Sequence, residues 1–389
     1  MTPAHAATCI ARTSTLTLLL TCICLSCAST TEGQHAQQHA EHAPDSIAAD
    51  TPDTLTLLFV GDFMQHSPQY QSAHVADNTY DYTEVFQFVR PEIRRHDLAI
   101  GNLETTLNGP PYSGYPRFCT PDAYLNGIID AGFDLLTTAN NHCADRGKSG
   151  LERTIYLMDS LRVMHVGTYA DSTTREADYP LIINQNNIRI ALLNFTYGTN
   201  GIPVRSPNIV NMIDTVQISR DIHKAKQSAP DCIIALPHWG TEYKSLPGKQ
   251  QQELARWLFR QGVDHIIGSH PHVPQPIVVQ TDSLARKHLV AYSLGNYISN
   301  QSDPNTYCGI MLSLRLVKSR QATELDSCAY ALTFVSRPPV GRRKSYRIYS
   351  INTPDSLLNE AEKRLRDNAA QSVRTLYGKH NIGISEYLF

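Results

Sequence analysis

The sequence has no excess of charge of either sign, and this narrows the range of partners. Its 389 residues contain 34 Lys and Arg against 36 Asp and Glu, which gives a formal net charge of -2. No basic excess points to nucleic acid, and no long run of like charges suggests an electrostatic tail. With 41% hydrophobic residues, the chain is long enough for one large domain or two ordinary ones. We therefore expect a globular protein without a nucleic-acid partner.

The apolar stretch near the N-terminus, residues 16–25, is too short to span a bilayer comfortably. Its length and its basic flank are typical of a signal peptide. It runs into the sequence LSCA at residues 25–28, which resembles a bacterial lipobox. This predicts a signal peptide at residues 1–26 and a lipid anchor on Cys27, which would hold the protein at a membrane. The alternative is an ordinary secretory signal cleaved near Ala28, and both interpretations predict an exported protein of the cell envelope.

Cysteines that could pair are also few. Beyond Cys27 their number is odd and no Cys-x-x-Cys pair occurs, so neither a disulfide framework nor a zinc ribbon is indicated. These remaining cysteines are Cys119, Cys143, Cys232, Cys308 and Cys328.

The segment up to residue 53 is polar and of low complexity, and it cannot bury a core. We expect residues 27–53 to form the lipidated cysteine and a flexible linker. Beyond it, short apolar runs of strand type alternate with helical patterns, which indicates an α/β fold. We divide this part into one catalytic-type domain, residues 54–320, and a C-terminal extension, residues 321–389, that packs on it.

Several local patterns predict individual elements. Residues 82–95 have helical spacing of apolar side chains, with a break or kink expected at Pro91. Residues 121–132 begin with Pro and end with Gly, as helices commonly do. The sequence Gln-Asn-Asn at residues 185–187 lies between two apolar runs and predicts a hairpin turn.

Five short segments that follow strand-type runs carry polar side chains able to bind metal. They are Gly61-Asp62, Gly101-Asn102-Leu103-Glu104, Ala139-Asn140-Asn141-His142, Pro237-His238-Trp239-Gly240 and Gly268-Ser269-His270-Pro271-His272. Because each segment follows a strand, we expect these side chains to gather at one sheet edge. Carboxylate, amide and imidazole together are the ligands of divalent metals such as Mn, Zn and Fe. The series predicts a binuclear metal centre.

At these segments the chain resembles the bacterial CapA family, which is associated with poly-gamma-glutamate capsule synthesis. The resemblance covers most of residues 54–320 in order. It is carried by Phe59-Val60-Gly61-Asp62, Gly101-Asn102-Leu103-Glu104, Thr138-Ala139-Asn140-Asn141-His142, Asp145-Arg146-Gly147, His238-Trp239-Gly240-Thr241-Glu242-Tyr243, Gly268-Ser269-His270-Pro271-His272 and Tyr292-Ser293-Leu294-Gly295-Asn296-Tyr297. The resemblance implies the fold of calcineurin-like metallophosphoesterases, a four-layer αββα sandwich of two sheets flanked by helices.

The chain departs from working phosphoesterases at two motifs. Those enzymes begin with Asp-x-His, whereas here Asp62 is followed by Phe63-Met64, and His66 is displaced. Their second motif carries an aspartate pair, in place of which this chain has Asn102 and Glu104. The expected number of ions is therefore one or two.

We expect six side chains to bind the metal, with Glu104 as the carboxylate that bridges two ions. They are Asp62, Glu104, Asn141, His238, His270 and His272. The resemblance implies that Asn141 binds the metal and that His142 donates a proton to the leaving group. The alternatives are ordinary structural roles: a turn for Asp62 and Asn141, a surface ion pair for Glu104, and packed or loop histidines for the others.

A second set of residues is expected around these ligands or at the substrate. It comprises Asn102, Arg117, Asp145, Arg146, Glu242 and Asn296. Glu242 would orient His238, Asp145 would orient His142, and a guanidinium group pairs well with phosphate or carboxylate.

These patterns predict an exported, lipid-anchored, metal-dependent hydrolase of the CapA type. Its expected substrate is an anionic polymer or a phosphorylated precursor in the cell envelope. The alternative is a non-catalytic envelope protein that assists capsule polymer assembly or export and retains the fold to bind a polyanion.

Overall fold

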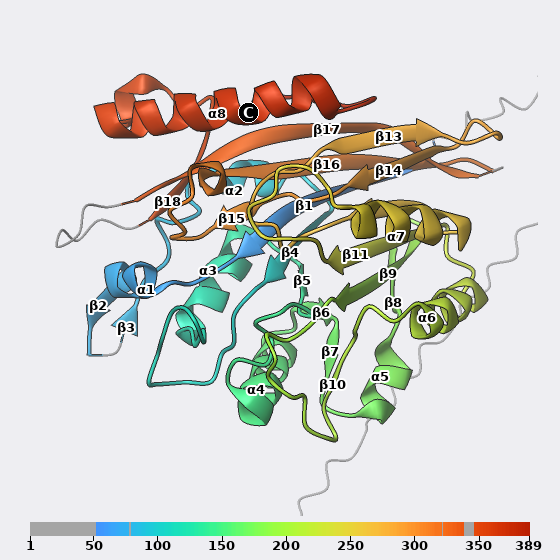
Figure 1. Ribbon diagram of the computed structural model, residues 1–389, viewed down its shortest axis with the longest axis horizontal. Helices are drawn as coiled ribbons and strands as arrows, with labels where there is room; N and C mark the ends of the chain where they lie inside the picture. Colours follow the sequence, from blue (N-terminus) through green and yellow to red (C-terminus); the bar gives the residue numbers. More distant parts are fainter. Residues whose placement is uncertain (1–51, 78, 321, 338–345) are drawn as a thin grey trace, which may run out of the picture. The chain divides into compact units, whose positions relative to one another are not determined.

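Two large sheets organise the protein in its computed structural model (Figure 1). The structure describes residues 52–77, 79–320, 322–337 and 346–389. The predicted signal peptide, the predicted lipidation at Cys27 and the predicted linker as far as residue 51 lie outside the described residues. No helix of the described part is both long enough and apolar enough to cross a membrane.

The first sheet has nine strands, and its main order is β18-β17-β16-β1-β4-β5-β6. Strand β15 pairs with β1, and β19 pairs with β17. The bounds are β1 Asp53–Phe63, β4 Leu98–Leu103, β5 Leu135–Thr137, β6 Met164–Val166, β15 Asn296–Ile298, β16 Cys308–Lys318, β17 Thr323–Ser336, β18 Arg347–Ser350 and β19 Ser385–Glu386. Strands β15, β1, β4, β5 and β6 run parallel, so the carboxyl ends of these strands lie at one edge.

The second sheet has six strands in the order β13-β14-β12-β11-β9-β8. The bounds are β8 Leu181–Gln185, β9 Ile188–Thr196, β11 Cys232–His238, β12 His265–Ile267, β13 Ile277–Thr281 and β14 Lys287–Ala291. The predicted hairpin is present between β8 and β9, where Asn186 and Asn187 both have positive φ. Asn tolerates this left-handed conformation better than most residues, which explains the turn. Two further pairs of short strands, β2 His74–Ala76 with β3 Thr79–Tyr80 and β7 Thr168–Tyr169 with β10 Ile209–Val210, complete the strands.

The apolar core lies on both faces of the first sheet. Alternate residues of β1 point in opposite directions, so Leu57 and Phe59 join one apolar cluster and Leu58 joins another. The first cluster also contains side chains of β9 and β11, and it therefore fills the space between the two sheets. The second cluster contains Leu125 and Ile128 of α3, and it fixes helices to the outer face of the first sheet.

Helices cover both outer faces and one end of the sandwich (Figure 1). Their bounds are α1 Ser67–Ala73, α2 Arg90–Ile93, α3 Asp122–Ala131, α4 Gly147–Ser160, α5 Ser172–Asp178, α6 Thr215–Gln227, α7 Lys249–Arg260 and α8 Glu360–His380, with 3-10 helices η1 Pro304–Tyr307 and η2 Asp355–Leu357. Helix α3 ends as predicted at Gly132, which has a φ of 109°. The predicted α/β class with two sheets flanked by helices is confirmed.

The helix predicted over residues 82–95 is wrong in extent. Only the four residues of α2 are helical, and most of the preceding segment consists of turns. Pro91 lies at the start of α2, because proline lacks the N–H that a position inside a longer helix would need. The apolar side chains that suggested the helix, Val85, Phe86 and Val89, are instead buried from successive turns.

The last part of the chain contributes to the first sheet. Strand β17 pairs along its length with β16, and α8 contacts β17, β16 and β13. The boundary proposed at residue 320 stays a prediction.

Candidate metal centre

The polar segments lie where strands of the two sheets end. Asp62 is next to the last residue of β1 and is paired in register with Asn102 of β4 and Asn296 of β15. Glu104 directly follows β4, and His238 is the last residue of β11. The strand ends of both sheets thus bring the predicted side chains together.

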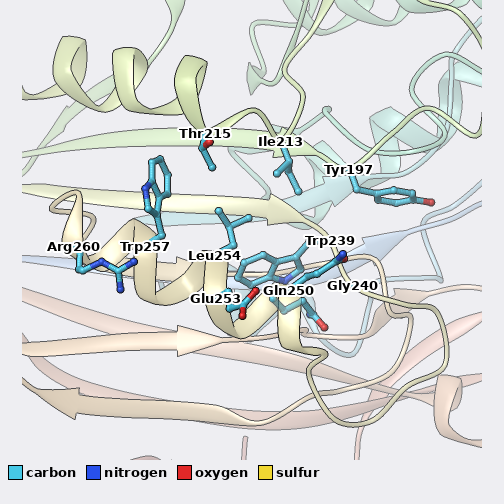
Figure 2. A pocket seen from close by; sticks show the side chains of 11 residues that line it. Tyr197, Ile213, Thr215, Trp239, Gly240, Gln250, Glu253, Leu254, Trp257 and Arg260 are labelled. Carbon is cyan, nitrogen blue, oxygen red and sulfur yellow. The ribbon is translucent and has the colours of Figure 1, made fainter.

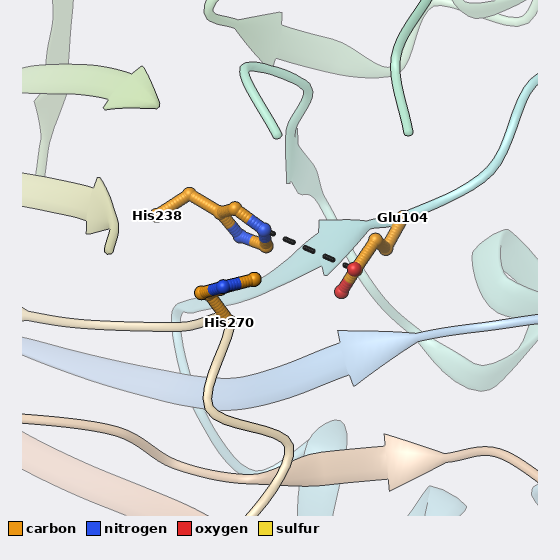
Figure 3. A group of neighbouring side chains, drawn as sticks. All are labelled: Glu104, His238 and His270. Atoms are coloured by element: carbon orange, nitrogen blue, oxygen red, sulfur yellow. Dashed lines mark ion pairs between the residues drawn. The ribbon is translucent and has the colours of Figure 1, made fainter. Parts of the chain in front are cut away.

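Three overlapping groups of side chains have ligand atoms within 4.8 Å of one another. The first is Glu104, His238 and His270 (Figure 3), the second is Asp62, Glu104 and His272, and the third is Glu242, His270 and His272. Glu104 belongs to the first two groups, and its Oε1 lies 3.8 Å from Nε2 of both His238 and His272. Five of the six predicted ligands are therefore gathered in these groups, and Glu104 lies where a carboxylate shared by two ions would be needed.

The carboxylate of Glu104 has no hydrogen bond within the part of the chain that the structure describes. Both of its oxygen atoms are buried, and neither has a hydrogen-bond partner among the described residues. Burial, reinforced by the negative charge of Asp62, raises the pKa of Glu104 well above its ordinary value. A buried carboxylate without partners is costly, and a bound cation would supply the missing interaction. The residues present therefore fit a divalent cation.

The imidazoles of the first group are held in the neutral form that binds metals. Burial and the neighbouring histidines lower the pKa of both His238 and His270 well below the usual value. Nδ1 of His270 is buried and has no hydrogen-bond partner within the described ranges of the chain. Nδ1 of His238 lies 2.9 Å from Oγ of Ser269, and Nε2 lies 2.8 Å from Oδ1 of Asn141. Asn141, the sixth predicted ligand, thus has its amide oxygen within hydrogen-bond distance of the His238 ring.

His272 is oriented by its neighbours. Its Nδ1 lies 3.0 Å from Oδ1 of Asn296 and 3.2 Å from Oδ2 of Asp62, so a proton on Nδ1 leaves Nε2 directed toward Glu104. The amide nitrogen of Asn296 donates to Ser299 and Gln301, and this fixes its oxygen toward His272. The structure therefore places Asn296 behind a candidate ligand, buried from solvent.

Asn102 holds Asp62 in the way that Asn296 holds His272. Its Nδ2 donates to Oδ1 of Asp62 over 2.8 Å, and its own Oδ1 accepts from Thr137 and Asn140. The amide orientation is thus fixed by two donors, and Asn102 positions the Asp62 carboxylate.

His142 lies outside the three groups and has its own carboxylate partner. Nδ1 lies 2.8 Å from Oδ2 of Asp145, which also accepts from the backbone N–H of Phe118. The imidazole packs against the ring of Phe118, with 4.6 Å between centroids. Nε2 lies 3.5 Å from Nδ2 of Asn200. The histidine is therefore held at Nδ1, and Nε2 is the atom with room to exchange a proton.

Glu242, Arg146 and Arg117, which were predicted around the ligands or at the substrate, differ in their exposure and in their contacts. Glu242 is half-buried and joins the third group, so it can bind a metal directly as well as support a histidine. Arg146 donates to Ser113 and to the carbonyl of Pro111, which holds the neighbouring loop. Arg117 is exposed. Neither arginine belongs to the three groups, and their role in substrate binding stays a prediction.

Asn200 had no signal in the sequence, because it lies in a loop outside the five polar segments, yet it contacts both Asn141 and His142. Ser269 contacts His238 from within one of these segments. His66 does not replace the histidine that the first motif lacks. Its Nδ1 lies near Gln69 and the backbone N–H of Asn300, and His66 is in none of the three groups.

Comparison with known proteins finds a family model and two relatives whose names refer to capsule or PGA synthesis. The family model of the bacterial capsule synthesis protein PGA_cap matches residues 56–301. Capsule biosynthesis protein CapA of Bacillus anthracis is 28% identical over 263 residues, which cover 64% of this chain and 61% of that protein. PGA biosynthesis protein CapA of Bacillus subtilis (strain 168) is 28% identical over 278 residues, which cover 69% of each chain. The chain therefore spans somewhat less than two thirds of the first of these relatives.

Solved structures with some likeness include NAD nucleotidase of Haemophilus influenzae, at 13% identity and a TM-score of 0.46, covering 86% of this chain and 64% of that one. The calcineurin-like phosphoesterase YfkN of Bacillus subtilis has 14% identity and a TM-score of 0.43, covering 84% of this chain and 98% of that one. At these scores the likeness bears on neither substrate nor mechanism. The family match, which spans well over half of the sequence and contains every strand-end motif, shows that this chain belongs to the PGA_cap family of bacterial capsule synthesis proteins.

Proposed function

We propose that the protein is an exported, metal-dependent hydrolase of capsule polymer metabolism. Its substrate would be an anionic polymer of the poly-gamma-glutamate type or a phosphorylated precursor of such a polymer. A lipid on Cys27 would anchor it in the cell envelope. The observation that carries the proposal is the buried Glu104 carboxylate, which has no hydrogen-bond partner among the described residues and lies 3.8 Å from the imidazoles of His238 and His272.

Six side chains would hold one or two divalent ions of Mn, Zn or Fe: Asp62, Glu104, Asn141, His238, His270 and His272. A divalent cation supplies a water molecule that is acidic near neutral pH, and it polarises the bond to be cleaved. Asn102 holds the carboxylate of Asp62, and Asn296 holds Nδ1 of His272 so that its Nε2 stays directed toward Glu104.

His142 would act as the proton donor. Its Nδ1 is held by the carboxylate of Asp145, which fixes the orientation of the ring. A proton on Nε2 is then available to the leaving group. The ring is fixed against Phe118, so the direction of this proton is set by packing.

The proposal is tested by metal analysis and turnover. Purified protein should contain a transition metal and should turn over p-nitrophenyl phosphate or poly-gamma-glutamate when Mn is added. His142→Ala should lose turnover but keep the metal, whereas His238→Ala should lose both. Circular dichroism checks that both variants are folded. Metal-bound protein that hydrolyses neither substrate class under these conditions would contradict the proposed catalysis.

A second candidate function rests on the first motif. Met64 occupies the place of the expected histidine and is buried, and His66 does not replace it. A centre with fewer ligands suits a non-catalytic protein that binds a polyanion and assists assembly or export of the polymer. Protein that is free of metal and inactive, yet binds poly-gamma-glutamate, would favour this role.

A further inference from the structure

A groove runs along α7 (Figure 2). Its volume is about 660 Å³, and Ile213 and Thr215 line it across from α7. A second hollow of about 670 Å³ adjoins it, shares Thr215 and Trp257 with it, and continues along α6 past Arg220 and His223. We call the two hollows together the α6–α7 groove.

Tyr197 connects this groove to the candidate metal centre. It lines the groove at the end opposite Arg260, and its ring lies 4.5 Å from that of His270. Its backbone N–H donates to the carbonyl of His238, and Trp239, the next residue, lines the groove. A ligand that fills the groove therefore has one end beside the histidines of the centre.

The groove combines apolar surface with unneutralised positive charge. Both tryptophans of the chain line it, and Trp257 is half-buried beside Leu254. Arg260 lies in the first hollow and Arg220 in the second, both exposed, and neither forms an ion pair within the described ranges. The carboxylate among the lining residues, Glu253, has Nζ of Lys249 within 3.6 Å.

We propose that the α6–α7 groove binds a stretch of a linear polymer that carries carboxylates, and that it feeds this polymer to the metal centre. The second part of this statement rests on the function proposed above. One monomer would fill a single hollow, whereas two hollows in series suit several units of a chain. One guanidinium in each hollow matches carboxylates repeated along a chain, because a lone phosphate would require the cations to converge on one point. The indole face of Trp257 and Leu254 would pack against the apolar links between the carboxylates.

Intrinsic fluorescence reports on this groove directly, because both tryptophans line it. The full mature chain is titrated with poly-gamma-glutamate oligomers at low salt, and a saturable change in emission is expected. Trp257→Phe should remove most of this change, because Trp239 is only 2% exposed. Arg260→Glu and Arg220→Glu should each weaken binding about tenfold or more, since hydrogen bonds to charged groups are the strong ones.

Arg364→Glu is the control for charge, because this arginine is exposed on α8 and lines neither hollow of the groove. It should bind the oligomer as wild type does. Equal weakening by Arg364→Glu and Arg260→Glu would show that only the overall charge matters and would overturn the proposal. Stronger binding of inorganic phosphate or of a neutral glycan oligomer than of the acidic oligomer would overturn the choice of ligand.

Binding and hydrolysis are separated by using His142→Ala, which should bind the oligomer and not cleave it. If no substrate is hydrolysed by the wild type but the arginine variants lose binding selectively, the groove is supported and the hydrolase is not. If hydrolysis occurs but the tryptophan signal never responds to the oligomer, the groove is wrong and the hydrolase stands.

Discussion

Oδ1 of Asn141 lies 2.8 Å from Nε2 of His238, although 97 positions separate the two residues in the sequence. Asn141 follows a strand of the nine-stranded sheet, and His238 ends a strand of the six-stranded sheet. The candidate centre is therefore built across the two sheets. Its integrity depends on how the sheets stack as well as on the ligands.

Removing the support of His272 should weaken metal binding while leaving the ligand in place. Asn296→Ala deletes the oxygen that lies 3.0 Å from Nδ1 of His272. Loss of such a supporting contact typically reduces metal affinity by about 10- to 100-fold. Competition with a chelator measures the affinity, and Asn305→Ala, an asparagine of η1 outside the site, is the control. Unchanged affinity in Asn296→Ala would show that Asn296 does not orient His272.

Glu104→Gln should stabilise the metal-free protein. Burial raises the pKa of Glu104 in the folded state, so the folded state favours the protonated form. The stability from this group is fully present below its ordinary pKa near 4.5 and is lost as pH rises through the raised value. The variant should lack this loss and be more stable at pH 8 by roughly 1–3 kcal/mol. Urea unfolding of both proteins at about pH 5 and pH 8 measures the difference.

The same variant should behave in the opposite way when metal is present. Wild-type protein should gain stability on adding Mn, and Glu104→Gln should gain much less because a ligand has been lost. Parallel stability curves for the two metal-free proteins over this pH range would contradict the assignment of Glu104 as an unpartnered carboxylate.

Asp145→Asn should lower turnover without lowering metal content. The carboxylate holds Nδ1 of His142 over 2.8 Å, and an amide can turn its NH2 group toward Nδ1 and favour the wrong tautomer of the ring. We expect kcat to fall about tenfold or more, against about 10²- to 10⁴-fold for His142→Ala. Because both changes act through one proton, the double variant should be no slower than His142→Ala alone. Additive losses would assign Asp145 a separate role.

His265 should contribute to acid sensitivity independently of the metal centre. It is buried in β12, its Nδ1 accepts the backbone N–H of Leu289, and burial lowers its pKa to about 3. A lowered pKa means that stability is fully present above the unfolded pKa of 6.5 and is lost as pH falls toward 3. Between about pH 6 and 5, His265→Gln should reduce the slope of unfolding free energy by about 1 kcal/mol per pH unit. An unchanged slope would show that the His265 imidazole does not cause the loss of stability in acid.

Gly61→Ala should disrupt the site through the backbone. An added Cβ would lie 1.7 Å from the carbonyl oxygen of Gly295, the same atom that accepts the N–H of Asp62 over 3.0 Å. We expect a loss of about 3 kcal/mol or more in unfolding free energy, together with weaker metal binding. Gly378→Ala in α8, where the added atom meets nothing within 4 Å, should instead stabilise the protein by up to about 1 kcal/mol. Similar stability for Gly61→Ala and wild type would refute the close contact.

The sequence alone was sufficient for the α/β class, the turn at Asn186 and Asn187, and the segments that supply the candidate ligands. Each of these depends on local patterns: alternation of strand and helix, a residue that tolerates positive φ, and polar residues directly after an apolar run. The extent of the helix at residues 82–95 was wrong because an apolar spacing of three or four also arises when successive turns bury their side chains. Local pattern does not distinguish the two cases.

Only the tertiary structure decided which residues meet. The isolation of the Glu104 carboxylate, the contact of Asn296 with His272, the approach of Glu242 to two histidines and the groove between α6 and α7 all join segments far apart in the chain. These relations follow from the stacking of two sheets and the packing of helices against them. Packing depends on the shapes of many side chains at once, and no repeat within a single segment encodes it.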